Sequence, residues 1–194
     1  MSAKNQMIQF VQGMQQMPLE KAEVIVNLFH EKQFSKNDNL IRSGKICNEY
    51  YFLVDGYVRS HTTNYNGEDI TTGFSSSGQI VCELFSFFKR VSSKEDFQAL
   101  SDCTVLCIPF ENVQTAFHSI PEFRELGRSI LVNAYANLKQ EMIAGLQETA
   151  EERYGRLVKS TPEIFQHAQL KNIASYLGVT DSSLSRIRKE FVKK

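Results

Sequence analysis

Hydrophobic and polar positions follow three different patterns along the chain. In residues 1–34, apolar residues such as Met7 and Val11 recur every three or four positions, which is the period of an amphipathic helix. From residue 40 to residue 109 the apolar runs are short, and turn residues interrupt them. A proline-free stretch with helical spacing then follows Pro121. The pattern predicts N-terminal helices over the first 34 residues, then a β-rich region, then a long helix.

The β-rich region contains turn residues at a regular spacing of about 11 residues. Asp-Gly and Asn-Gly between strand-like runs favour tight hairpin turns, because glycine accepts a positive φ without a Cβ clash. This spacing predicts an antiparallel sandwich or jelly roll. The four turn pairs are Ser43-Gly44, Asp55-Gly56, Asn66-Gly67 and Ser77-Gly78.

The long helix carries an apolar seam whose members are alternately four and three positions apart, so that they share one side of the helix. The seam is formed by Leu131, Tyr135, Leu138 and Met142, and it continues through Gly145 and Thr149. It could pack against the chain's own sandwich or against a second copy of the helix. Because a helix of this length extends beyond a small domain, we expect the second copy.

The stretch "LKNIASYLGVTDSSLSRIRKEF", residues 170–191, contains two short helical patterns that meet at Gly178. Glycine permits the sharp reversal between them, and Thr180 is a good N-cap for the second helix. The residues expected to point inward are Ile173, Ala174, Leu177, Leu184 and Ile187. The arrangement predicts a helix-turn-helix, whose second helix enters the major groove of DNA.

The outer face of the second helix is polar and basic. Arg186 could donate two hydrogen bonds to guanine, and Arg188, Lys189, Lys193 and Lys194 could contact phosphates. The alternative is an ordinary helical hairpin with a solvated charged face. The residues expected to contact DNA are Thr180, Asp181, Ser182, Ser183, Ser185, Arg186, Arg188 and Lys189.

Composition agrees with a folded protein that has one basic segment. Of 194 residues, 42% are hydrophobic, and the net charge of zero divides into −4 for residues 1–150 (13 basic, 17 acidic) and +4 for residues 151–194 (9 basic, 5 acidic). A basic C-terminal segment suits a polyanionic partner. No apolar run reaches the roughly 20 residues that span a bilayer, and no signal peptide is visible. We therefore expect a cytoplasmic protein with no membrane contact.

Cysteine and histidine are scattered. Cys47, Cys82, Cys103 and Cys107 form no C-x-x-C pair, so we expect buried or half-buried, reduced thiols and no metal site. The four histidines, at positions 30, 61, 118 and 167, lie far apart, and no motif pairs a nucleophile with a base. We do not expect an enzyme.

Three stretches together resemble the CRP/FNR superfamily of bacterial transcription regulators, over residues 10–194. "LIRSGKICNEYYFLVDGYVRSH" resembles its paired strands, and "GQIVCEL" resembles the start of its phosphate-binding cassette. "IASYLGVTDSSLSRIRKEF" matches its recognition motif, with Arg186 at the base-contacting position. The resemblance implies an α+β fold. A cyclic-nucleotide-binding-like antiparallel β-roll (1–120) would precede a dimerisation helix (121–150) and a helix-turn-helix domain (151–194).

The resemblance also implies an effector pocket formed by Gly78, Cys82, Glu83, Leu84, Glu95 and Asp96. Glu83 stands where the family has its ribose-binding glutamate. Where the family holds the cyclic phosphate with an Arg-Ser or Arg-Thr pair, counting forward from Glu83 gives Glu95 and Asp96. Two acids there would repel a phosphate, so we do not expect cyclic AMP as the effector. Lys89, Arg90 or Lys94 could replace the missing cation if the register differs.

We thus expect a homodimeric regulator that binds an inverted repeat in double-stranded DNA. RNA polymerase and an unidentified small-molecule effector are further candidate partners, and no cofactor is expected. The resemblance leaves open a haem group, which a Soret band would reveal. The competing hypothesis is a sensory or scaffold module that acts through protein contacts, and salt-dependent DNA binding separates the two.

Overall fold

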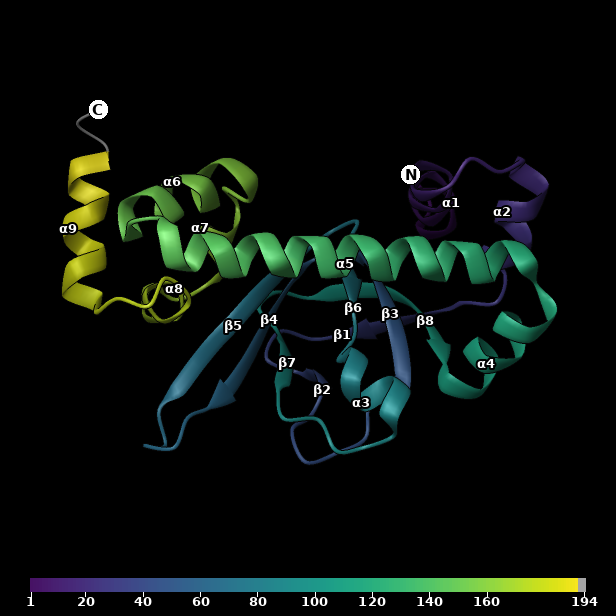
Figure 1. Ribbon diagram of the computed structural model, residues 1–194, viewed down its shortest axis with the longest axis horizontal. Helices are drawn as coiled ribbons and strands as arrows, with labels where there is room; N and C mark the ends of the chain where they lie inside the picture. Colours follow the sequence, from purple (N-terminus) through teal and green to yellow (C-terminus); the bar gives the residue numbers. More distant parts are fainter. Residues whose placement is uncertain (192–194) are drawn as a thin grey trace.

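The computed structural model describes residues 1–191 and begins with two helices, α1 (Ala3–Met14) and α2 (Leu19–Val26) (Figure 1). The expectation of helix through residue 34 is wrong at its end, because His30–Phe34 forms strand β1. This short segment pairs along its whole length with β8 (Cys103–Pro109), and sheet pairing across the chain decides its structure. A five-residue segment is too short for its spacing to separate helix from strand.

The β-rich region folds into a jelly-roll-like pair of antiparallel sheets. In the part of the chain that the structure describes, one sheet has the order β1-β8-β3-β6 and the other the order β2-β7-β4-β5. The remaining strands are β2 (Asn39–Ile41), β3 (Glu49–Asp55), β4 (Tyr57–Thr63), β5 (Asp69–Ser76), β6 (Ile80–Val81) and β7 (Asp96–Ala99). The expected sandwich is therefore confirmed.

The turn glycines all adopt positive φ, but only one of the expected turns closes a hairpin. Asn66-Gly67 lies in the loop between the paired strands β4 and β5. Asp55-Gly56 and Ser77-Gly78 instead connect strands of different sheets. Gly56 has a φ of 105°, and a Cβ there would lie 2.6 Å from both the Asp102 carbonyl oxygen and the Cys103 Sγ. Glycine is therefore required where the chain crosses between the sheets.

Between β6 and β7 lies the short helix α3 (Leu84–Lys89), and after β8 come α4 (Phe110–Ser119) and the long helix α5 (Pro121–Gln147). Helix α5 runs along the length of the molecule, above the sheets (Figure 1). The main core fills the space between the sheets, α1, α2, α4 and the first turns of α5. Its largest fully buried side chains include Phe52, Phe87 and Leu106.

The chain ends in a cluster of short helices at one end of α5: α6 (Ala150–Ser160), α7 (Ile164–His167), α8 (Leu170–Tyr176) and α9 (Asp181–Phe191) (Figure 1). Their core is a second hydrophobic cluster, which Leu100 joins from the β-roll. The α+β architecture expected from the sequence is confirmed. Among residues 1–191, no helix is both long and apolar enough to cross a membrane.

Candidate nucleic-acid interface and effector region

Helices α8 and α9 form the expected helix-turn-helix. Gly178 adopts a φ of 68° in the turn between them. Thr180 Oγ1 accepts a hydrogen bond from the Ser183 amide at 3.2 Å, so Thr180 caps α9 as its position predicts. Leu184 and Ile187 are buried in the second core, and they fix which face of α9 points outward.

The outward face of α9 carries nearly the whole set of residues expected to contact DNA. Thr180, Asp181, Ser182, Ser185, Arg186, Arg188 and Lys189 are exposed, and Ser183 is half-buried. Asp181 lies in the first turn, while Arg188 and Lys189 lie in the last turn. Each of these charges is favourable at its end of the helix dipole. Lys193 and Lys194, also expected to contact phosphates, lie outside the described residues.

The apolar seam of α5 is not covered by the chain's own sandwich. Leu131 and Met142 are exposed, and Tyr135 and Leu138 expose 71% and 69% of their surface. The interpretation as packing within one chain is therefore wrong for Tyr135, Leu138 and Met142, whereas Leu131 lines an apolar cavity beside residues of the core. Three exposed apolar residues that the seam pattern missed extend the same surface, namely Val132, Ile143 and Leu146.

Thr149 does not belong to this seam, contrary to its spacing in the sequence. Helix α5 ends at Gln147, and Thr149 caps α6. Its side chain accepts from the Glu152 amide, while the Glu152 carboxylate accepts from the Thr149 amide, which forms a reciprocal capping box. Gly145 remains on α5 and is exposed.

The helix-turn-helix packs on the edge strand β5 of the β-roll. The Thr71 amide donates to Ser175 Oγ at 3.0 Å, which satisfies a backbone group of that edge. Two ring contacts also join the β-roll to the C-terminal helices. Phe74 packs edge-on against Tyr176 of α8, and Tyr57 stacks on His167 of α7 with their ring centroids 4.2 Å apart. The orientation of α9 thus depends on the β-roll.

Helix α6 is held to the end of α5 by two arginines. Arg156 forms ion pairs with Glu141 on α5 and with Glu148, the latter at 3.2 Å. Arg153 donates to the carbonyl oxygens of Glu148 and Leu177, each at 2.7 Å. Arg153 therefore ties the end of α5 directly to the turn of the helix-turn-helix.

The residues expected around the effector come from the turn before β6 and the start of α3. Gly78 occupies that turn with positive φ, and Leu84 begins α3. Glu83 is the N-cap of α3, with its carboxylate accepting from the amides of Phe85 at 3.2 Å and Ser86 at 2.8 Å. The Cys82 Sγ lies 4.0 Å from the Cys47 Sγ.

The acidic residues Glu95 and Asp96 also take part in hydrogen bonds within the β-roll. Asp96 begins β7 and accepts from the Ser43 amide at 3.1 Å, while the Glu95 backbone makes a tight turn with Ser93. Arg90, a candidate replacement cation, points elsewhere. It donates to the Cys47 carbonyl at 3.0 Å and lies 4.1 Å from the centre of the Phe110 ring. Lys89 and Lys94 are exposed.

The four cysteines are free thiols, of which Cys82 is half-buried and the other three are buried, as expected. Burial raises the pKa of Cys82 well above its usual range, and it also raises the pKa of Cys103. The hydrogen bond with Cys82 lowers the pKa of Cys47, although burial opposes this effect.

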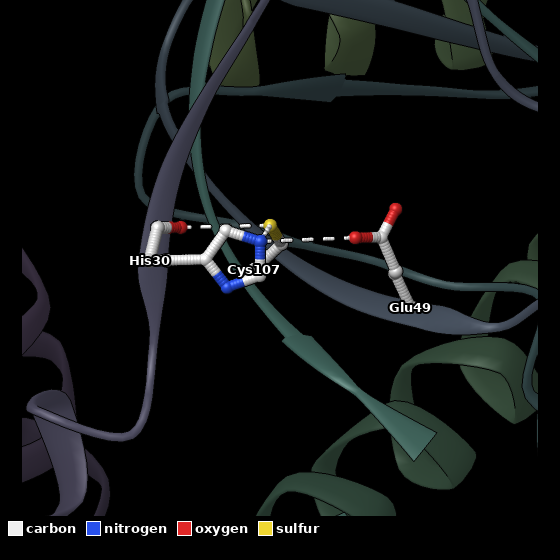
Figure 2. Close-up of side chains that lie close together, drawn as sticks. All are labelled: His30, Glu49 and Cys107. Carbon is white, nitrogen blue, oxygen red and sulfur yellow. Dashed lines mark hydrogen bonds and ion pairs between the residues drawn. The ribbon is translucent and has the colours of Figure 1, made fainter. Parts of the chain in front are cut away.

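One cluster of side chains with potential metal-ligand atoms was missed in the sequence. His30, Glu49 and Cys107 lie on three neighbouring strands with their ligand-type atoms within 4.8 Å of one another (Figure 2). Their separation along the chain, up to 77 positions, leaves no local motif. The other three histidines contact residues outside this cluster. His61 contacts Asp69, His118 contacts the Gln114 carbonyl, and His167 contacts Tyr57.

Comparison with known proteins agrees with this geometry. Residues 31–119 match the cyclic nucleotide-binding domain family. The chain is 25% identical to the electron transport regulator A of Shewanella oneidensis and 23% identical to the fumarate and nitrate reduction regulatory protein of Escherichia coli. Each match covers 84% of this chain and 69% of the relative. Residues 31–119 are thus similar to cyclic nucleotide-binding domains, and the chain as a whole is similar to regulators of the CRP/FNR type.

Solved structures of CRP/FNR proteins share the fold. FixK2 from Bradyrhizobium japonicum superposes with a TM-score of 0.72 at 17% identity, covering 85% of both chains. The c-di-GMP responsive regulator CLP of Xanthomonas campestris superposes with a TM-score of 0.70 at 16% identity, covering 91% of this chain and 92% of CLP.

Proposed function

We propose that this protein is a homodimeric transcription regulator of the CRP/FNR type that reads double-stranded DNA with α9. The observation that carries the proposal is the two-sided character of α9. Leu184 and Ile187 anchor one face in the core, while the short side chains of Ser182 and Ser185 flank Arg186 on the exposed face. Short residues allow close approach to the bases, and a guanidinium matches the O6 and N7 acceptors of guanine.

The exposed seam of α5 supports the homodimer. Two α5 helices packed along Leu131, Tyr135, Leu138 and Met142 would relate two copies of α9 by a two-fold axis. Recognition helices on such a dimer meet successive major grooves about 34 Å apart. The DNA site should therefore be an inverted repeat.

Substitution of Arg186 tests the base-reading role. Arg186→Ala should lose roughly 1–3 kcal/mol of specific binding and relax the preference at one base position in each half-site. Lys189→Ala is the matched control on the same face. It should weaken specific and random DNA alike and lower the salt dependence of binding. Binding is measured by fluorescence anisotropy over a salt series, on a site selected from a random library.

Two outcomes would contradict this role. Equal losses on specific and random DNA for Arg186→Ala would remove Arg186 from base recognition. If the parent chain has no salt-dependent affinity for any duplex, the competing sensory or scaffold function replaces the proposal. The relatives are regulators, so an enzymatic function has no support from them.

We also propose that cyclic AMP is not the effector. A cyclic phosphate leaving water needs a cation or converging amide donors. Of the nearby cations, Arg90 is committed to the Cys47 carbonyl and the Phe110 ring, and Lys89 and Lys94 face solvent. The residues that the resemblance assigns to the pocket include three carboxylates, Glu83, Glu95 and Asp96, which disfavour a phosphate.

Isothermal titration with cyclic AMP and cyclic GMP tests this proposal, with no heat of binding expected. Glu83→Gln is the appropriate variant, because a glutamine oxygen can still accept from the α3 amides while the charge is lost. Micromolar binding by the parent chain that Glu83→Gln abolishes would overturn the proposal.

A further inference from the structure

Three metal-ligand side chains converge on one face of the sheet that contains β1, β8 and β3 (Figure 2). We propose that His30, Glu49 and Cys107 form a binding site for a divalent transition-metal ion, with Zn²⁺ as the ion that fits their chemistry. This site lies apart from the DNA-reading face and does not depend on the proposed function.

Sheet register brings the three residues together. Cys107 on the central strand β8 lies opposite His30 on β1 and opposite Tyr51 on β3, two residues beyond Glu49. His30 Nε2 lies 3.0 Å from Cys107 Sγ and 3.9 Å from Glu49 Oε1. A tetrahedral zinc ion holds such atoms about 3.3–3.6 Å apart, given its bond lengths. Small side-chain rotations suffice to reach that geometry.

The donor set suits zinc better than magnesium or calcium. Imidazole and thiolate are ligands for zinc and its neighbours in the first transition row, whereas magnesium and calcium prefer oxygen alone. The site is also open to solvent, because 56% of the His30 side chain and 23% of the Glu49 side chain are exposed. An ion can therefore reach the buried Cys107 sulfur from the side of His30, and water can fill a fourth position.

A second layer of contacts orients Glu49. Its Oε2 accepts from Lys32 Nζ at 2.7 Å and from the Tyr51 hydroxyl at 2.8 Å, which leaves Oε1 facing His30. These two hydrogen bonds hold the carboxylate in position, as outer contacts do for the ligands of metal sites. Glu49 and a Cys107 thiolate together supply two negative charges against the single positive charge of Lys32.

The thiol of Cys107 gives binding a dependence on pH. An ordinary cysteine thiol has a pKa of about 8.5 and is mostly protonated at neutral pH. A metal ion must displace that proton to bond the sulfur. Binding should therefore release a proton to the buffer and weaken as the pH falls. The bound ion would also link the edge strand β1 to β3 across β8, and so raise the temperature of unfolding.

Titration with Co²⁺ tests the site, because a thiolate bound to cobalt gives a charge-transfer absorption in the near ultraviolet. The full chain, stripped with a chelator and reduced with a phosphine, should bind one Co²⁺ per chain, and Zn²⁺ should displace it. Cys107→Ala should lose the absorption. His30→Gln and Glu49→Gln should each weaken binding by at least about tenfold. Zn²⁺ should raise the melting temperature of the parent chain but not of Cys107→Ala.

Cys103→Ala is the matched control, because Cys103 is a buried thiol on the same strand whose Sγ faces the Tyr57 carbonyl instead. It should leave cobalt binding unchanged. His30→Gln keeps the test decisive if Cys107→Ala unfolds, because the exposed histidine contributes little to the core. The proposal fails if the parent chain shows no charge-transfer absorption. It also fails if Cys107→Ala retains the absorption and Cys82→Ser loses it, which would assign the ion to Cys47 and Cys82.

Discussion

At the scale of single residues, the buried charge of Arg59 in the β-roll depends on its hydrogen-bond partners. Only 3% of this residue is exposed, and its guanidinium donates to both carboxylate oxygens of Asp69 and to Thr71 Oγ1. A charge in a protein interior is tolerated when paired and hydrogen-bonded in this way. The Asp69 carbonyl also accepts from Ser175 on α8, at 3.4 Å. The pair therefore lies directly beneath the helix-turn-helix.

Asp69→Asn should lower the free energy of unfolding by about 1–3 kcal/mol at neutral pH, because it leaves the Arg59 charge without its counterion. The loss is smaller than for a fully buried pair because 55% of the Asp69 side chain is exposed to solvent. Urea unfolding measures the change. Glu31→Gln removes an exposed carboxylate on β1 and should change stability little. A loss in Asp69→Asn no larger than in that control would contradict the role of the pair.

The same pair predicts a dependence on pH. Burial raises the pKa of Asp69, but the hydrogen bonds and charge of Arg59 outweigh it and hold the pKa below the ordinary value of 3.8. The folded state therefore binds this proton less tightly than the unfolded state, and the pair stabilises the fold above that ordinary pKa. This contribution is lost as the pH falls through the lower folded-state pKa. The stability difference between parent and Asp69→Asn should shrink in acid, and an unchanged difference would argue against the pair.

At the scale of elements, the junction between α5 and α6 shows how a local signal overrides a periodic one. Spacing alone continues the seam to Thr149, but the same stretch contains Thr149-x-x-Glu152, the pattern of a capping box. Its reciprocal hydrogen bonds start a new helix, and the chain turns at Glu148. The turn allows Arg156 to reach back to Glu141, and it directs α6 toward the second core.

Thr149→Ala should cost about 0.5–2 kcal/mol of unfolding free energy, because the Glu152 amide loses its acceptor. Thr115→Ala is the control: Thr115 is an exposed threonine inside α4 whose hydroxyl bonds only to the Glu111 carbonyl one turn earlier. There alanine should be neutral or slightly stabilising, since it has the higher helix propensity. Chemical unfolding measures the free energy of unfolding of both variants. A similarly small change in the two would show that the capping box does not stabilise the protein.

At the scale of the whole molecule, the sequence predicts most of what local pattern controls. The order of helices, sandwich, long helix and helix-turn-helix follows from periodicity, and Gly178 and Thr180 correctly mark the turn between α8 and α9 and the N-cap of α9. Contacts between distant segments leave no such pattern. The hydrogen bond between Thr71 and Ser175 joins residues that are 104 positions apart. The cluster of His30, Glu49 and Cys107 depends on the register of three strands. Neither the sheet to which a strand belongs nor these contacts could be predicted from spacing.

The apolar seam of α5 also bears on the assembly of the molecule, because its exposed residues would decide how two copies of α9 are placed in a dimer. Apolar residues such as Tyr135 and Leu138 form a continuous exposed strip, which Leu146 extends with 81% of its surface exposed. A strip of this kind along one helix is typical of an interaction surface. We therefore expect two chains to bury it between parallel α5 helices, because a parallel pair places both copies of α9 at the same end of the dimer, where one DNA duplex can meet them.

Leu138→Asp should split this dimer, because it would bury an unpaired carboxylate in the interface. Since Leu138 is exposed in the single chain, the variant should keep its helical circular dichroism and sediment as a monomer, whereas the parent should sediment near twice 22.2 kDa. Gln140→Asp adds the same charge to an exposed position outside the seam and should remain dimeric. The split variant should also lose its preference for an inverted repeat over a single half-site. A parent chain that is monomeric at micromolar concentration, or a dimeric Leu138→Asp, would contradict this interface and the two-fold DNA site derived from it.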